Sequence, residues 1–290
     1  TAGFSRFLEI MRTEPGIKDA PDAETLGAVR GDIEYRDVSF SYDGKVPVLE
    51  NVFLHIHPGE CLAVVGPSGG GKTTLCQLIP RFYDVTEGRL LIDGHDVRGV
   101  TQESLRRNIG IIQQDVFLFA GSIRENIRYG RLDATDAEVE AAARASGCHE
   151  FIMQLENGYE TVAGGAGGHL SGGERQRAWM AMTLAQKTKI LILDEPTTFL
   201  DISYQLEVLE LIKELNASLG LTVIMVLHDL NQAARYSDNI HVLDRGRICE
   251  WGSPDKILRS DLIKGVFKIQ AHIYEDDINQ CLYFIPEKRV

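Results

Sequence analysis

The sequence contains no long hydrophobic run. None of its stretches approaches the roughly 18 consecutive apolar residues that a membrane-spanning helix needs. The longest apolar runs, Ile190–Leu193 and Val223–Leu227, are short and typical of buried parallel strands. The chain also lacks both the basic, apolar and small-residue order of a secretory signal and an initial methionine, so we expect a segment of a longer protein.

Cysteine is scarce, and positive charge is not in excess. The five cysteines are odd in number and widely scattered, without metal-ligand spacing, so a reduced cytosolic setting is the simplest interpretation. The formal net charge of −12 argues against a broad nucleic-acid surface, because such a surface usually carries a basic stripe. With 44% hydrophobic and 25% charged residues, the composition is ordinary for a soluble globular protein.

Candidate transition-metal ligands are also few. His55 and His57 flank Ile56, which would place two imidazoles on one face of a strand. No third ligand is apparent nearby in the sequence. A solvated strand face is therefore the favoured interpretation of this pair, and a metal site is the less favoured one.

The order of the expected elements indicates an α/β fold. Residues 1–31 combine a short helical pattern with a polar, proline-containing stretch and are interpreted as a linker into a domain. Strand-like segments at Ile33–Tyr42 and Val48–His57 precede a region with mainly helical patterns, at about 115–175. From Ile190 onward, strands and helices alternate, which is typical of a parallel sheet.

A glycine-rich loop carries the first chemical motif. Residues 66–73 fit the pattern G-x-x-x-x-G-K-[ST] between an apolar strand, Cys61–Val65, and an expected helix. Backbone amides of such a loop and the dipole of the following helix favour a bound phosphate. Lys72 is expected to reach the β- and γ-phosphates of a nucleotide, and the Thr73 hydroxyl to ligate Mg²⁺. The predicted nucleotide-binding residues here are Gly66, Pro67, Ser68, Gly69, Gly70, Gly71, Lys72, Thr73 and Thr74.

A second motif places two carboxylates after a buried strand. The apolar run Ile190–Leu193 leads directly to Asp194 and Glu195. In open α/β sheets, ligands gather at the carboxyl ends of the strands. Asp194 is therefore predicted to hold Mg²⁺, directly or through water, and Glu195 to polarise the attacking water as a general base.

The segment Leu170–Glu174 stands 20 residues before the second motif. Ser171 is expected to cap a helix, and the amides of Gly172 and Gly173 would offer a second anion-binding helix end. In this order, the three motifs resemble the ATP-binding cassette (ABC) ATPases that drive membrane transporters. In that family this segment is presented across a dimer to the ATP of the partner, so the resemblance implies that one chain does not complete its own site.

Four further residues match positions of the same family. Tyr42 matches the aromatic residue on which adenine stacks, a contact worth on the order of 1–3 kcal/mol. Gln114 matches a glutamine that touches Mg²⁺ and the water, with Gln113 as the competing assignment. His228 matches a histidine that contacts the γ-phosphate, and Asp201 matches an aspartate at the dimer contact. The implied catalytic residues are Lys72, Gln114, Glu195 and His228.

The resemblance covers residues about 32–252 and implies an α/β P-loop NTPase fold of the ABC-ATPase type. That fold has a mixed central sheet, an antiparallel β-subdomain and an α-helical subdomain. Residues 1–31 would be a linker from an absent membrane domain, and 32–290 the ATPase domain. The implied cofactors are ATP and Mg²⁺. The implied partners are a second copy of the chain and, in the parent proteins, a transporter membrane domain, but no nucleic acid. The expected location is cytoplasmic, at the cytoplasmic face of the membrane in the parent transporters.

The finer resemblance differs along the chain. Residues 1 to about 165 resemble ABC exporters, whereas residues from about 175 resemble the ATPase subunits of iron–siderophore importers. Pro196 and Asp229 stand where an exporter is expected to carry Ala and Arg. We therefore hypothesise an engineered chimera joined within about 164–178. A natural, divergent siderophore-importer-like ATPase subunit is the alternative.

Two functional alternatives to an ATP-hydrolysing transporter domain also stay open. One is a scaffold that binds nucleotide without turnover. The other is a non-transport ABC ATPase that acts on DNA or the ribosome. Such a protein usually carries a long coiled-coil insertion or a second cassette, and the sequence shows neither.

Overall fold

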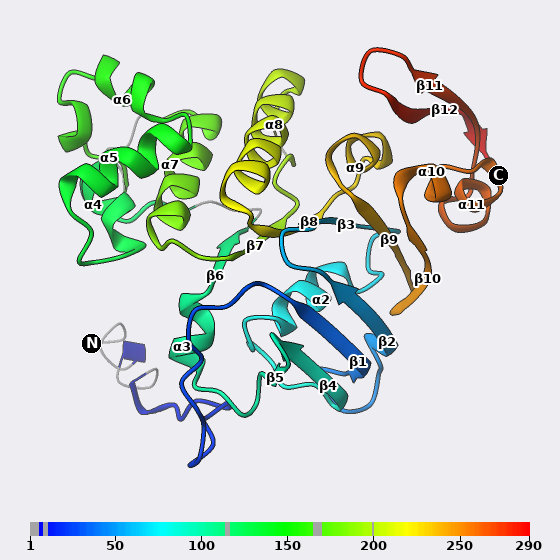
Figure 1. Ribbon diagram of the computed structural model, residues 1–290, viewed down its shortest axis with the longest axis horizontal. Coiled ribbons are helices and arrows are strands. Elements are labelled where there is room, and N and C mark those ends of the chain that lie inside the picture. Colours follow the sequence, from blue (N-terminus) through cyan, green and yellow to red (C-terminus); the bar gives the residue numbers. More distant parts are fainter. Residues whose placement is uncertain (1–5, 8–10, 114–116, 165–169, 199) are drawn as a thin grey trace.

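The computed structural model describes residues 6–7, 11–113, 117–164, 170–198 and 200–290. In this part of the chain, the named strands form sheets of six, four and two strands. Figure 1 shows the six-stranded sheet in the middle, with a group of helices at one end of the molecule and the two-stranded sheet at the other. Among the described residues, no helix combines the length and the apolar composition of a membrane span.

The six-stranded sheet is mixed, and its strands are β3 (Cys61–Val65), β6 (Ile109–Ile112), β7 (Ile190–Asp194), β8 (Thr222–Val226), β9 (Asn239–Asp244) and β10 (Arg247–Gly252). They lie in the order β10-β9-β3-β8-β7-β6, and every neighbouring pair except β9–β10 is parallel. Every residue of β3 and β8 is buried, as expected for apolar strands covered on both faces. The predicted mixed central sheet is therefore confirmed.

A four-stranded antiparallel sheet packs beside it and consists of β1 (Ile33–Phe40), β2 (Leu49–Ile56), β4 (Glu87–Ile92) and β5 (His95–Asp96). Burial alternates at the end of β2, so Leu54 and Ile56 face the core and His55 faces outward. The register places Ile33 opposite Ile56 and Glu34 opposite His55. This sheet confirms the predicted antiparallel β-subdomain.

The helical subdomain lies at one end of the molecule and contains α4 (Ile123–Tyr129), α5 (Asp136–Ala145), α6 (His149–Gln154), the 3₁₀ turn η1 (Gly158–Glu160) and α7 (Gly172–Ala185). Helices α4, α5 and α7 each begin with a capping box, in which a hydroxyl and a glutamate three residues later exchange hydrogen bonds with the backbone. Buried side chains such as Ile127, Ala143 and Ala181 form a separate apolar cluster between these helices.

The remaining elements cover the central sheet and extend to the C-terminus; they are α2 (Lys72–Leu78), α3 (Gln102–Arg107), α8 (Ile202–Leu219), α9 (Leu230–Tyr236), α10 (Pro254–Ile257), α11 (Ser260–Leu262), the π-helical turn η3 (Ile263–Phe267), β11 (Ile269–Asp276) and β12 (Cys281–Arg289). One apolar cluster joins the two larger sheets with α2 and α3, and another joins the opposite sheet face with α8 and α9. The β11–β12 hairpin docks on α9, where the Asn231 side chain exchanges two hydrogen bonds with the backbone of Phe284.

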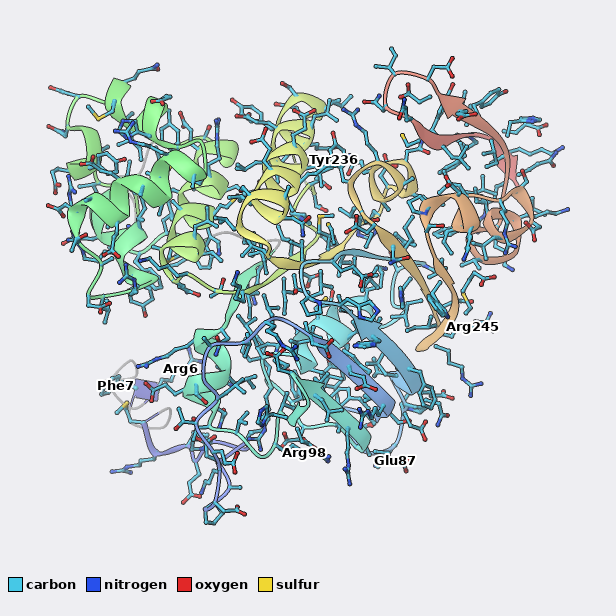
Figure 2. The ribbon with its side chains drawn as sticks, viewed as in Figure 1. Arg6, Phe7, Glu87, Arg98, Tyr236 and Arg245 are labelled. Atoms are coloured by element: carbon cyan, nitrogen blue, oxygen red, sulfur yellow. The ribbon has the colours of Figure 1, made fainter. Side chains whose placement is uncertain are left out.

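Two backbone contacts connect the sheets near the glycine-rich loop. The Gly246 carbonyl accepts a hydrogen bond from the Glu50 amide at 2.8 Å, and the Gly246 amide donates to the Gly70 carbonyl at 3.0 Å. Figure 2 labels the adjacent Arg245 at the turn between β9 and β10, which lies beside β2. This turn therefore ties the antiparallel sheet to the loop.

The described part of the predicted linker packs against the domain. Leu26 and Val29 are buried, Glu24 forms a parallel bridge with Val100, and Asp19 accepts a hydrogen bond from the Gln102 amide. The helical pattern near the start lies partly outside the described residues. That residues 1–31 lead from a membrane domain stays a prediction.

Candidate nucleotide-binding site

The glycine-rich loop runs from the end of β3 to the start of α2 and has no room for side chains at two of its glycines. A Cβ built on Gly66, which has φ +148°, would lie 1.9 Å from the Leu243 carbonyl oxygen. A Cβ on Gly71, which has φ +99°, would lie 2.9 Å from a Leu49 methyl and 3.0 Å from the Val48 carbonyl oxygen. Both the backbone conformation and the close packing therefore require glycine at these positions.

Lys72 is buried at the first position of α2. Its Nζ donates hydrogen bonds to the carbonyl oxygens of Gly66 at 2.9 Å and Pro67 at 3.0 Å. Burial lowers the pKa of the Lys72 ammonium, and the carboxylates of Glu195 and Asp194 oppose this effect. The cation is thus held inside the curve of the loop, where it can meet an anion.

Thr73 and Asp194 present oxygen atoms to one another across the sheet edge. The Thr73 hydroxyl donates to Asp194 Oδ1 at 3.1 Å. Burial raises the pKa of the Asp194 carboxyl, and the hydrogen bond from Thr73 partly offsets that. A hydroxyl and a carboxylate oxygen are the hard ligands that Mg²⁺ prefers, so these two residues fit the predicted metal ligands.

Glu195 and His228 form the second pair at this edge. His228 Nε2 lies 2.6 Å from Glu195 Oε1, and the Thr198 hydroxyl donates to Glu195 Oε2 at 3.2 Å. Glu195 has φ +55°, a conformation that non-glycine residues seldom adopt, and its amide donates to the Val226 carbonyl. The carboxylate is therefore fixed from both oxygens and from its backbone, as a catalytic base requires.

These groups converge on one cavity of about 300 Å³. The residues that line it are Val48, Ser68, Gly69, Gly70, Gly71, Lys72, Thr73, Thr74, Glu195 and His228. The predicted phosphate loop is thus brought together with the predicted base and the predicted histidine, which follow it by more than 100 residues in the sequence. Asp194 is connected to the loop by its hydrogen bond with the Thr73 hydroxyl.

Tyr42 lies beside this cavity without lining it. Its hydroxyl shares a hydrogen bond with the Thr74 hydroxyl at 2.9 Å. Its ring packs edge-on against Phe40 and Tyr83, at centroid distances of 4.8 and 5.0 Å. With 53% of its surface exposed, the ring retains an open side on which a base can stack.

The other predicted residues do not line the cavity as the structure describes it. Ser171 and Asp201 are exposed N-caps, of α7 and α8 respectively, and each accepts a hydrogen bond from the backbone of its own helix. Gly172 is exposed as well, whereas Gly173 packs against the Tyr204 ring. Gln114 lies outside the described residues, so its predicted contact with Mg²⁺ and water stays a prediction.

Two residues of the site were not found from the sequence. Val48 lines the cavity from the segment before β2, and Thr198 bonds the predicted base. The position of Thr198, three residues after Glu195, is a signal that could have identified it, because hydroxyl side chains commonly bond groups two to four residues away. No local pattern identifies Val48, since its position depends on how the two sheets pack.

Comparison with known proteins relates the sequence of this chain to those of transporter proteins. A sequence profile described as "ABC transporter" matches residues 49–198, just over half of the chain. The chain is 47% identical over 257 residues to an "ATP-dependent lipid A-core flippase" of Syntrophus aciditrophicus, covering 89% of this chain and 42% of that protein. It is 42% identical over 271 residues to a "putative multidrug export ATP-binding/permease protein" of Bacillus subtilis, covering 93% and 46%.

A solved structure agrees with these relatives. The structure described as a bacterial Atm1-family ABC exporter with ATP bound superposes with a TM-score of 0.80 at 40% identity, covering 89% of this chain and 45% of that one. The chain therefore spans less than half the length of these relatives.

The comparisons do not support the chimera hypothesis or an importer origin of the second half. A match of 257 residues in a chain of 290 necessarily crosses residues 164–178, where the junction was expected. Described elements before and after this range also pack together. Strands β6 and β7 pair in parallel from Ile109–Ile190 onward, and the Trp179 indole donates to the Ile111 carbonyl at 3.1 Å.

Proposed function

Because the chain belongs to the ABC transporter family, as an ATP-binding domain related to those of exporters, we propose that it binds ATP with Mg²⁺ and hydrolyses it to ADP and phosphate. The observation that carries the proposal is the meeting of five side chains at one edge of the central sheet. The Lys72 ammonium, the Thr73–Asp194 oxygens and the Glu195–His228 pair all surround the same loop. Phosphoryl transfer depends mainly on positioning and charge stabilisation, and this arrangement supplies both.

The proposed reaction begins with the phosphates on the loop amides. Lys72 exchanges the Gly66 and Pro67 carbonyls for phosphate oxygens and so compensates their charge. Thr73 and Asp194 would hold Mg²⁺, which neutralises phosphate charge when bound. Glu195 accepts a proton from water as the water oxygen bonds to the γ-phosphorus, and the bond between that phosphorus and the bridging oxygen breaks with its electron pair leaving on ADP. His228 keeps the Glu195 carboxylate in position.

A head-to-tail dimer completes the proposed site. Ser171 and Asp201 are exposed and lie outside the cavity, yet both cap helices whose N-termini attract negative charge. A second copy of the chain, rotated so that its α7 start faces this loop, would bring Ser171 and Gly172 to the γ-phosphate. The proposed hydrolysis therefore requires two chains.

We place this domain at the cytoplasmic face of a membrane, as the motor of a longer transporter. The relatives named above include a flippase and a multidrug exporter, of which this chain matches less than half. Residues 1–31 would connect the domain to the membrane part, which would select the transported substrate. The net charge of −12 argues against a nucleic-acid partner.

Phosphate release at increasing protein concentration tests the proposal. We expect turnover per chain to rise with concentration, because two chains form the active unit. The Glu195→Gln variant should keep its affinity for ATP and lose about 10²–10⁴-fold in rate, the usual contribution of a general base. Glu156→Gln, an exposed position that does not line the cavity, is the matched control and should hydrolyse ATP like the parent chain.

Each part of the proposal has its own refutation. Unchanged hydrolysis in Glu195→Gln would show that Glu195 is not the base. Tight ATP binding by Lys72→Ala would contradict the assignment of the loop. ATP binding without phosphate release at any concentration would identify a nucleotide-binding scaffold without turnover.

A further inference from the structure

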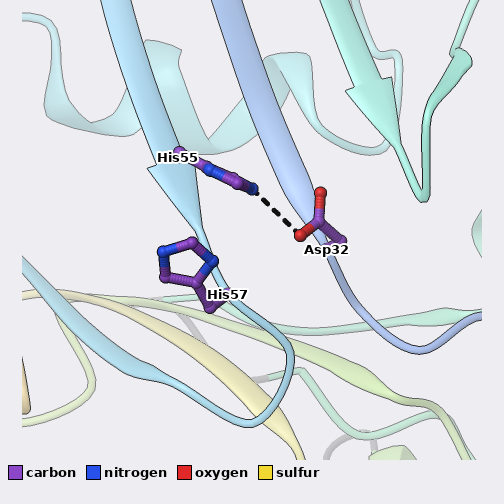
Figure 3. Close-up of side chains that lie close together, drawn as sticks. All are labelled: Asp32, His55 and His57. Atoms are coloured by element: carbon purple, nitrogen blue, oxygen red, sulfur yellow. Dashed lines mark hydrogen bonds and ion pairs between the residues drawn. The ribbon is translucent and has the colours of Figure 1, made fainter.

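We propose that Asp32, His55 and His57 form a second metal site, specific for a divalent transition-metal ion and separate from the nucleotide site. No third ligand was apparent near the two histidines in the sequence, but the structure places the Asp32 carboxylate beside them. Asp32 precedes β1, and the antiparallel pairing of β1 with β2 brings it to the end of β2. Figure 3 shows the three side chains together on the outer face of these strands.

The three side chains are close enough to share one ion. Their potential ligand atoms all lie within 4.8 Å of one another, and His55 Nε2 lies 2.9 Å from Asp32 Oδ2. The two imidazole rings are 4.2 Å apart at an interplanar angle of 59°. A tetrahedral ion with bonds of about 2.0–2.1 Å separates its ligand atoms by roughly 3.3 Å, so small side-chain rotations suffice.

The backbone of Asp32 is held in place by a neighbouring carboxylate. Asp93 accepts hydrogen bonds from the amides of Arg30, Gly31 and Asp32, at 2.6, 3.2 and 2.9 Å. The Asp93 amide in turn donates to the Asp32 carbonyl at 2.9 Å. Three of these hydrogen bonds occupy the Asp93 side chain, and together the four position the Asp32 backbone. The Asp32 carboxylate itself has only His55 as a hydrogen-bond or ion-pair partner among the described residues.

The histidine strand is equally well anchored. The His57 amide donates to Glu60 Oε2 at 2.8 Å, and the Glu60 amide donates back to the His57 carbonyl. The Thr222 hydroxyl joins the two strand ends, since it donates to the Gly31 carbonyl at 2.8 Å and accepts from the Gly59 amide at 3.0 Å. The ligands therefore project from a preformed backbone, which reduces the ordering that binding requires.

The donor set decides the class of ion. Two imidazole nitrogens and one carboxylate oxygen suit Zn²⁺, Co²⁺, Ni²⁺ and Cu²⁺, whereas Mg²⁺ and Ca²⁺ prefer oxygen ligands alone. Both histidines are exposed and Asp32 is half-buried, so water can complete the coordination. The ion would fasten the point where residues 1–31 enter the antiparallel sheet.

Titration of the full chain with Co²⁺, without nucleotide, tests the site by visible absorption, and calorimetry with Zn²⁺ gives the affinity. We expect one ion per chain, bound at least tenfold more weakly by His57→Ala and by Asp32→Asn, and no competition from millimolar Mg²⁺. Far-UV circular dichroism checks that these exposed substitutions preserve the fold.

Two matched controls separate this site from others. His272→Ala removes an exposed histidine that has one carboxylate neighbour, Glu287 at 3.5 Å, and should bind metal like the parent chain. His228→Ala tests the nucleotide site and should also bind metal normally. The proposal is overturned if the parent chain binds no Co²⁺ or Zn²⁺, if His57→Ala binds as tightly as the parent, or if His228→Ala abolishes binding.

Discussion

Replacing Gly71 by alanine is expected to destabilise the protein by about 2–5 kcal/mol. The new Cβ would lie 2.9 Å from a Leu49 methyl and 3.0 Å from the Val48 carbonyl oxygen. Overpacking of this kind costs about 1–3 kcal/mol, because neighbouring atoms have to shift. The left-handed backbone, at φ +99°, adds about 1–2 kcal/mol for a residue with a Cβ.

Urea denaturation followed by circular dichroism measures this effect. With a slope of about 3 kcal/mol per molar urea, the transition midpoint should fall by roughly 0.7–1.7 M. ATP affinity should fall as well, because the substitution moves the loop away from β2. Gly172→Ala is the control for stability, since its Cβ would meet nothing within 4 Å and its φ is not positive. If Gly71→Ala and the parent chain unfold at the same urea concentration, the close packing of the loop against β2 is wrong.

Two further substitutions test buried charges. Burial raises the pKa of Asp194, so its ionised form lowers stability at neutral pH. Asp194→Asn should therefore raise the melting temperature at pH 7, and this gain in stability should disappear as the pH falls toward about 4. The variant should also bind ATP without dependence on Mg²⁺. Burial lowers the pKa of His241 to about 4, and its Nδ1 has no hydrogen-bond partner in the described part of the chain. The unfolded chain therefore takes up this proton first as the pH falls below about 6.5, which should remove up to roughly 3 kcal/mol between pH 7 and pH 4. His241→Leu should flatten that part of the pH–stability curve, measured by urea midpoints; an unchanged slope would contradict the assignment.

The elements that position the nucleotide site were predictable because their signals are local. The apolar run Cys61–Val65 forms β3 with the same bounds, and α2 begins at Lys72 as expected after the last glycine of the loop. The run before Asp194 likewise forms β7. Each signal combines an apolar strand with the residues that end it, and both can be recognised without reference to distant parts of the chain.

Elements with weak apolar patterns were missed. Helix α3 buries only Ser104 and Leu105 of its six residues, so its sequence lacks the periodic apolar pattern that predicts a helix. No residue of β12 is buried, so the C-terminal hairpin depends on docking against α9 rather than on its own sequence. Asp32 was missed as a candidate ligand for a related reason, because only the register of β1 and β2 brings it to His55.

The expected importer origin of the second half depended on individual residues that have local roles here. Asp229 caps α9 by accepting hydrogen bonds from the amides of Asn231 and Gln232. The Pro196 carbonyl accepts a hydrogen bond from the Gln176 side chain, which links α7 to the segment after β7. A helix cap and a carbonyl acceptor serve any relative of this fold equally well, so such residues carry little information about ancestry.

The two hydrogen bonds between Lys72 and the carbonyls of its own loop imply that nucleotide binding is an exchange rather than an addition. The binding energy that a ligand gains from this ammonium is only the difference between a hydrogen bond to its own acceptor and one to a neutral carbonyl. Hydrogen bonds to a charged acceptor are roughly twice as strong as those between neutral groups. An uncharged nucleoside would gain nothing from this exchange and would have only the proposed stacking on Tyr42. Under the proposed function, phosphate charge would therefore determine what this loop contributes to affinity, and the base would contribute separately.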